Sequence, residues 1–198
     1  METCYRSVRH PALVVVLVVT ATVANVALAS LNHALSVPLY FDSLFTFVVT
    51  FALGLVPGMV VAVATNGVLA LFQMVAFPLV VCHLLTVVGC WLTFRSLRPS
   101  LTAFLVAGLV SGLSNGIAGS VVSYFLFEGV TKLNPIDDLV LGLVVAGQSL
   151  GGAVFWSGLV TNLVDKLLSA VVAFYLTTGL VRGLYKINPR FLANTSNS

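Results

Sequence analysis

The sequence predicts an all-α integral membrane protein: a bundle of six transmembrane helices with a re-entrant or capping segment before the last helix. Two observations lead to this fold class. Hydrophobic residues make up 59% of the 198 residues and charged residues only 8%, with a mean hydropathy of +1.10. Soluble domains carry about 25% charged residues, so this composition does not supply a soluble surface. Apolar segments also alternate with short polar or basic connections, which is typical of helices that cross a bilayer.

The six apolar segments form a single membrane domain that covers residues 1–198. We expect helices at about 11–31, 42–56, 58–76, 78–94, 100–127 and 159–182.

The first segment has two interpretations. Its apolar run from Ala12 to Leu31 is 20 residues long, which is enough to span a bilayer. Basic residues precede it, however, and Ala27-Leu28-Ala29 resembles a signal-peptidase site. A retained helix and a cleaved signal peptide at residues 1–29 both remain open.

The second and third segments are joined by a tight corner that we place at Pro57-Gly58. Asp42 opens the second segment, where the free N–H groups and the positive end of the helix dipole stabilise a carboxylate. Asn66 lies in the middle of the third segment, and an amide in lipid needs a partner within the protein. Both side chains are therefore expected to face the interior of the bundle.

The fifth segment has a face of small residues with glycine at 108, 112 and 116. Such a face lets another helix backbone approach closely. Tight helix packing is one interpretation, and a wall beside a bound solute is the other. Asn115 in the middle of this face favours a combination of the two.

The segment 128–158 begins polar and becomes apolar from Leu139, so it could be a seventh crossing or an outer segment that folds back. The basic residues favour the second interpretation. With six helices and a cytoplasmic N-terminus, seven of the nine basic residues lie on the inner side, as the positive-inside rule requires. A seventh crossing would move three of them outside. We therefore predict cytoplasmic termini and an outer capping segment at 128–158, with 139–157 re-entrant.

The last segment carries Asn162, Asp165 and Lys166. A charged group at mid-membrane costs about 2.5–3.5 kcal/mol on insertion scales, so these side chains should line a cavity or pair with polar groups. Asn162 and Lys166 share a helix face at spacing i, i+4, whereas the adjacent Asp165 and Lys166 are not expected to face each other.

We expect no enzyme, no cofactor and no metal site. The G-x-S-x-G match at 112–116 lies inside an apolar helix, whereas the nucleophile motif requires a strand-turn-helix elbow. The phosphate-binding pattern G-x-x-x-x-G-K-[ST] is absent from the sequence. His33 and His83 are isolated and have no second ligand at metal spacing. The net charge of +3 does not indicate nucleic-acid binding, because the basic residues mark one side of the membrane.

The polar residues that these segments bring toward the outer side form the candidate binding site. It should hold a small, flat solute with polar edges, with the loop 32–41 as a lid. Lys166 would meet an acceptor or anionic group, and Asp42 or Asp165 would hold a donor or orient the lid. The predicted substrate-binding residues are Asp42, Asn66, Asn115, Glu128, Trp156, Asn162, Asp165 and Lys166.

Several of these positions carry a family resemblance. The stretch Pro38-Leu39-Tyr40-Phe41-Asp42-Ser43, with Thr46, Pro57-Gly58 and Thr65-Asn66, resembles the S components of energy-coupling-factor (ECF) transporters, and Asn162-x-x-Asp165-Lys166 adds to the likeness. The resemblance implies a bacterial cytoplasmic-membrane protein that binds a vitamin or similar micronutrient from outside. It also implies partners, namely a coupling subunit and two ATPase subunits.

The docking surface for that coupling subunit departs from the family pattern. The family often has an A-x-x-x-A face on its first helix, where this chain has Thr20-x-x-x-Ala24, and the A-x-x-x-A match is Ala103 to Ala107 in the fifth segment. We take Thr20 and Ala24 as the candidate docking residues. The alternative function is a membrane sensory module that signals to a separate output protein, and a purely structural subunit would bind no ligand.

Overall fold

The computed structural model describes residues 11–131 and 134–187. All regular structure within these residues is helical, with seven α-helices, one short 3-10 helix and no strand. The prediction of an all-α fold is therefore confirmed. The elements are α1 (Pro11–Ala34), α2 (Leu44–Leu53), α3 (Leu55–Ala70), η1 (Met74–Ala76), α4 (Val80–Ser96), α5 (Leu101–Phe127), α6 (Asn134–Val145) and α7 (Leu150–Ile187).

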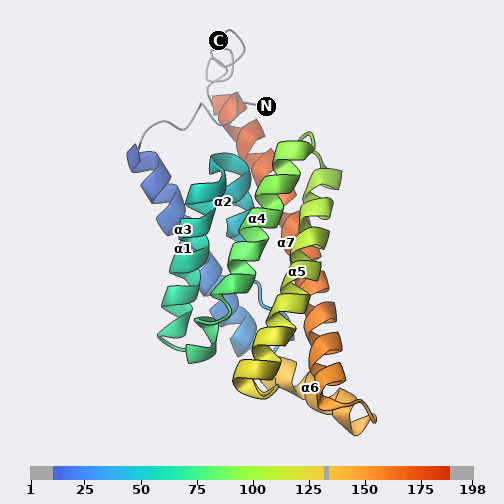
Figure 1. The fold of residues 1–198 in the computed structure, drawn as a ribbon. Coiled ribbons are helices and arrows are strands. Elements are labelled where there is room, and N and C mark those ends of the chain that lie inside the picture. Colours follow the sequence, from blue (N-terminus) through green and yellow to red (C-terminus); the bar gives the residue numbers. More distant parts are fainter. Residues whose placement is uncertain (1–10, 132–133, 188–198) are drawn as a thin grey trace.

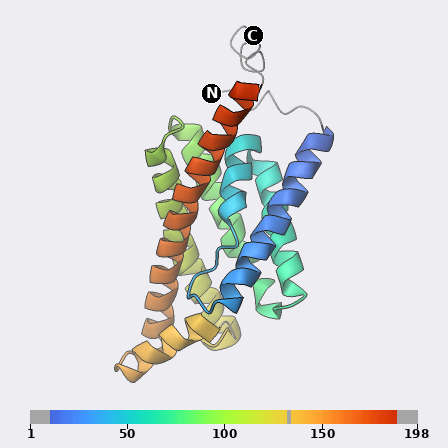
Figure 2. The ribbon, with the colours of Figure 1, turned by 180° about the vertical axis from the view of Figure 1, so that it is seen from behind.

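The long helices lie side by side and define two ends of the bundle (Figures 1 and 2). At the upper end α1 begins, α7 ends, and a short turn joins α4 to α5. At the lower end α6 lies across the bundle where α5 ends and α7 begins. The short helix α2 is central, because it contacts α1, α3, α4 and α7.

Three helices are long and apolar enough to cross a membrane: α1, α5 and the Leu150–Gly179 part of α7. The apolar helices α2, α3 and α4 are shorter, at 10 to 17 residues. Large apolar side chains such as Val15, Val60 and Leu168 are exposed on the outer surface. Exposed apolar surface on this scale is typical of a chain surrounded by lipid, so the apolar helices are compatible with a membrane protein.

The corner between the second and third helices lies at Gly54, not at Pro57-Gly58 as predicted. Gly54 has φ +89°, a backbone conformation that favours glycine. Pro57 instead lies in the first turn of α3, where the backbone N–H has no partner within the helix and proline is tolerated. The third helix also ends earlier than expected, at Ala70, and the remaining residues form a turn and η1.

The segment 128–158 differs from the prediction, because the last helix begins at Leu150 and not at about residue 159. The side chain of Ser149 accepts a hydrogen bond from Gly152 N at 3.2 Å, which stabilises the start of α7 despite two glycines in its first turn. The preceding helix α6 has 12 residues and is about 18 Å long. It is too short to cross a bilayer core of about 30 Å.

The small-residue face of α5 packs against α7, as the helix-packing interpretation predicted. A Cβ atom added to Gly112 would lie 2.9 Å from the Cα atom of Leu163, and one added to Gly116 would lie 2.8 Å from the Cα atom of Leu159. Glycine at these positions therefore allows the two backbones to meet. Ala103 and Ala107 of the same helix are fully buried.

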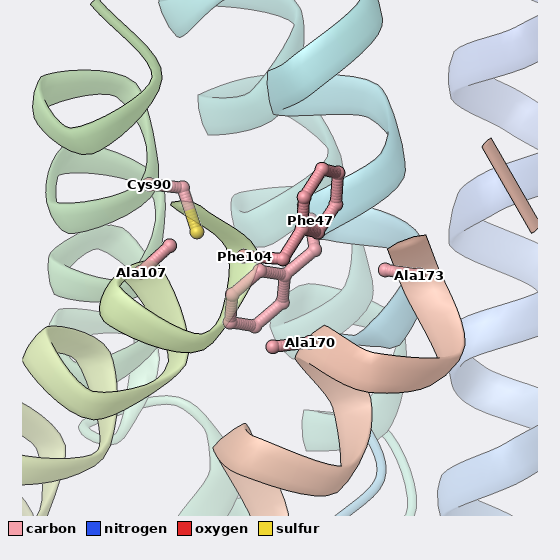
Figure 3. Close-up of a cluster of buried hydrophobic side chains, with 6 residues drawn as sticks. All are labelled: Phe47, Cys90, Phe104, Ala107, Ala170 and Ala173. Carbon is pink, nitrogen blue, oxygen red and sulfur yellow. The ribbon is translucent and has the colours of Figure 1, made fainter. Parts of the chain in front are cut away.

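The upper half of the bundle has an apolar core between α2, α4, α5 and α7 (Figure 3). Phe47 and Phe104 fill its centre, with Cys90 beside them. The ring of Phe104 also packs on Phe94 and Phe174, with ring centroids 4.7 and 5.6 Å apart. This core fixes the positions of four helices in the upper half.

The lower half is different, because a chain segment that is not helical packs against its helices: Leu35 and Ser36 are exposed, residues 37–42 are half-buried and Ser43 is buried. The chain leaves α1 at the lower end and rises between the helices to the start of α2 (Figure 2). We call residues 35–43 the inner segment. It carries polar groups to the middle of the bundle, and the candidate site is built around them.

Candidate functional site

The site begins with the ammonium group of Lys166, a residue in the middle of α7 with only 2% of its surface exposed. Its Nζ donates to Asp165 Oδ2 at 2.6 Å, to Ser43 Oγ at 2.7 Å and to Asp42 Oδ1 at 3.2 Å. An ammonium group has three protons, so all three are used within the protein.

The contact between Asp165 and Lys166 contradicts the expectation that adjacent helix residues do not face each other. The long Lys166 stem brings Nζ back to Asp165. The other carboxylate oxygen of Asp165 accepts a hydrogen bond from Phe41 N at 2.8 Å. Both α7 side chains are therefore drawn toward the inner segment, and this tertiary attraction outweighs the local helix geometry.

The inner segment is held at both of its ends. At its lower end the side-chain amide of Asn32 donates to the carbonyl oxygens of Val37 and Leu39. At its upper end Asp42 and Ser43 are bound by Lys166. These bonds satisfy polar groups that have no helix or sheet partner inside an apolar bundle.

The sequence predicts that Asp42 opens the second helix, but in the structure Asp42 lies before that helix. The helix α2 begins at Leu44 with Ser43 as its N-cap, and the Ser43 side chain makes no capping hydrogen bond. The Ser43 hydroxyl accepts from Lys166 instead, and Phe45 N in the first turn of α2 donates to Asn25 Oδ1. Asp42 nevertheless lies next to the N-terminus of α2, where the helix dipole stabilises its charge.

A second polar network joins four helices beside this cluster. Asn66 of α3 donates to His83 Nδ1 at 2.6 Å, and the Nε2 atom of His83 lies 2.7 Å from Thr46 Oγ1. Asn25 of α1 also donates to Thr46 Oγ1, at 3.0 Å. Because Nδ1 accepts a hydrogen bond, we assign the proton to Nε2, which makes His83 neutral and a donor to Thr46.

Three small cavities meet at Tyr40 of the inner segment. The central cavity, about 30 Å³ in volume, is lined by Asp42, His83, Asn115, Asn162 and Lys166, together with Tyr40, Leu79, Cys82 and Gly119. A cavity of about 70 Å³ adjoins it and shares Tyr40, Asp42 and Leu79. A third, of about 20 Å³, shares Tyr40, Gly119 and Asn162. A water needs about 10–15 Å³ by this measure, so the central cavity admits a group of only a few atoms.

The structure brings most of the predicted site residues together. Asp42, Asn115, Asn162 and Lys166 line the central cavity, and the predicted shared face of Asn162 and Lys166 is confirmed. Asn66 lines the adjoining 70 Å³ cavity. Asp165 is fully buried behind Lys166.

Two predicted residues lie elsewhere. Glu128 is the exposed residue that ends α5. Trp156 is 51% exposed and packs edge-on against Phe155, with ring centroids 5.4 Å apart. Neither side chain lines any of the three cavities. They were assigned to the site because segment 128–158 was expected to cap it.

Sequence reasoning missed Asn25, Ser43, Thr46 and His83. Each is a single polar residue in or beside an apolar segment, so each resembles an isolated buried polar group. A signal was nevertheless present, because an amide or imidazole in a lipid-embedded helix needs a partner. This signal marks the residues as candidates for a polar network, but it does not say which of them pair.

The candidate docking residues lie on the outer surface of α1, where Thr20 is exposed and Ala24 is half-buried. Ala103 and Ala107 pack inside the bundle, so their A-x-x-x-A motif is not an available surface. Ser114 of the G-x-S-x-G match lies within the uninterrupted helix α5, and its hydroxyl donates to Val110 O at 2.9 Å.

The ion cluster generates a prediction about stability. Replacing Lys166 with methionine keeps the length of the stem but leaves the buried Asp165 carboxylate without its cation. Removing one partner of a buried ion pair destabilises a protein by about 3–5 kcal/mol, so the unfolding midpoint in a detergent titration should fall clearly. The double variant Lys166→Met/Asp165→Asn should recover part of this loss. Equal stability of Lys166→Met and the wild type would show that the pair does not hold the fold.

Comparison with known proteins adds no identification. No protein-family model, curated protein or solved structure matches the chain. The resemblance of residues 38–66 and 162–166 to ECF S components therefore stays an expectation. A functional assignment depends on the ion cluster, the polar network and the cavities between them.

Proposed function

We propose that the protein is a substrate-binding membrane subunit of the S-component type, which takes a vitamin or similar micronutrient from outside the cell. One observation carries this proposal. Charged and polar side chains from the inner segment, α4, α5 and α7 converge on a cavity inside an otherwise apolar bundle. Convergent polar groups on apolar walls are the usual form of a small-molecule site.

The site has more polar side chains than a structural ion pair requires. Lys166 and its two carboxylates satisfy one another, and a pair that served packing alone could be closed off by apolar side chains of similar volume, often without loss of stability. Here Asn115, Asn162 and His83 also line the space beside Asp42. Several buried polar groups around one cavity favour a role in binding.

The proposal includes an orientation and partners. Arg95 and Arg98 lie at the upper end, next to the α4–α5 turn, so the positive-inside rule favours a cytoplasmic upper end and an external lower end. In this arrangement the inner segment with α2 counts as one of six crossings. A coupling subunit and two ATPase subunits would drive uptake, with Thr20 and Ala24 as the candidate contact on α1.

Filling the central cavity tests the binding function. A Cβ atom added to Gly119 would lie 3.5 Å from Cys82 Sγ, an ordinary contact, so Gly119→Leu should fold and fill the space. We expect the solute that co-purifies in mild detergent, measured by mass spectrometry, to fall about ten-fold or more, because a steric penalty of only 1.4 kcal/mol lowers affinity ten-fold.

The matched control is Gly67→Leu on the exposed face of α3, where an added Cβ atom meets nothing within 4 Å. This variant should retain the same solute as the wild type. If Gly119→Leu also retained it, the central cavity would not be the binding site. If the wild type carried no solute at all, the binding function itself would lose its support.

The orientation is tested by cysteine labelling in a Cys4→Ser background. Gln148 lies in the exposed turn between α6 and α7, and Ser96 is exposed at the end of α4. A membrane-impermeant maleimide should label Gln148→Cys in intact cells and Ser96→Cys only after permeabilisation. The reverse pattern would place the binding site on the cytoplasmic side.

A further inference from the structure

The charge around the central cavity does not cancel. Lys166 contributes one positive charge, whereas Asp42 and Asp165 contribute two negative charges, so the cluster carries one net negative charge. His83 beside it is neutral, because its Nδ1 atom accepts from Asn66. The arginines Arg95 and Arg98 lie near the upper end of the bundle and do not line the cavity.

The charged donor at the cavity is fully engaged, and each of the two amide nitrogens uses one of its two protons within the protein. Lys166 uses its three protons on Asp42, Ser43 and Asp165. The amide nitrogen of Asn115 donates to Thr86 Oγ1 at 2.8 Å, and that of Asn162 donates to Gly158 O at 2.8 Å.

The acceptors are not satisfied in the same way. Asn115 is 2% exposed, and its buried Oδ1 atom has no hydrogen-bond partner among the described residues. Thr86 does not relieve it, because the Thr86 hydroxyl gives its proton to Cys82 O. Asn162 Oδ1 also receives no hydrogen bond from the part of the chain that the structure describes.

A buried acceptor without a donor costs free energy, and a buried net charge costs more. Both penalties are removed by a ligand that brings a positive charge and N–H groups. The Tyr40 hydroxyl can donate or accept, so it adapts to either. A ligand with an anionic group would instead meet a negative cluster, and Lys166 has no free proton to offer it.

We propose that the cavity selects a solute with a positively charged, hydrogen-bond-donating head group of the ammonium or amidinium kind, which pairs with Asp42 and donates to Asn115. This inference rests on the proposed binding function and names its substrate class. It differs from the expectation that Lys166 meets an anionic group. Lys166 instead positions Asp42. The head group occupies the central cavity, and the rest of the solute extends into the 70 Å³ cavity that shares Asp42 and Tyr40.

Three probes of nearly the same shape test the charge preference: benzamidinium, benzamide and benzoate carry a positive, zero and negative charge on the same ring. Full-length protein in lipid nanodiscs is titrated with each, and the rise in its thermal unfolding midpoint gives the apparent affinity. We expect benzamidinium to bind about ten- to a hundred-fold more tightly than benzamide, because a hydrogen bond to a charged partner improves affinity by about this factor. Benzoate should give no shift.

Asp42→Asn should reduce the affinity for benzamidinium to that for benzamide, because the variant neutralises the cluster. Asp138→Asn is the matched control, since it removes the same charge from an exposed position on α6 and should change nothing. If Asp42→Asn does not fold, the three-probe series on the wild type decides the question alone.

Two outcomes overturn the inference, and they differ in what they say about the binding function. If benzamide or benzoate binds as tightly as benzamidinium, and Gly119→Leu abolishes that binding, the cavity holds solutes but does not select a cation. If none of the three probes shifts the midpoint, the cation preference is refuted. The binding function is then decided by the mass spectrometry of the co-purified solute in the wild type and in Gly119→Leu.

Discussion

An ammonium group in the middle of an apolar bundle has to be paired, and the partner of Lys166 comes from a segment 124 residues earlier in the chain. Asp42 and Ser43 reach it because α2 begins only at Leu44, which leaves the inner segment extended between the helices. The same bonds keep polar backbone out of lipid. Lys166 thus ties the start of α2 to the middle of α7, and the central cavity lies beside this contact.

Along its length the bundle has an apolar part above the ion cluster and a polar part below it. Above the cluster, Phe47 and Phe104 fill the space between helices. Below it, amides and His83 face small cavities that meet at Tyr40. This division is consistent with the proposed binding function, because the apolar core and the central cavity are formed by different residues.

Hydropathy and helix periodicity were enough to predict the helical fold, the approximate spans of α1, α4 and α5, and the inward placement of Asn115, Asn162 and Lys166. One error had a local cause and another a tertiary one. Ser149 caps α7, which therefore starts at Leu150 and not at about residue 159, and the Ser43 hydroxyl accepts from Lys166 instead of capping α2. The network around His83 could not be assembled from isolated polar residues, because nothing local in the sequence says which helices become neighbours.

The central claim is that a solute sits against the ion cluster, and an experimental structure of the protein with its co-purified solute tests this most directly. The account predicts ligand density in the central cavity, within hydrogen-bond distance of Asp42 and Asn115, while the pair between Lys166 and Asp165 stays intact. Density bound elsewhere, or a cavity closed by its own side chains in a preparation that carries solute, would contradict it.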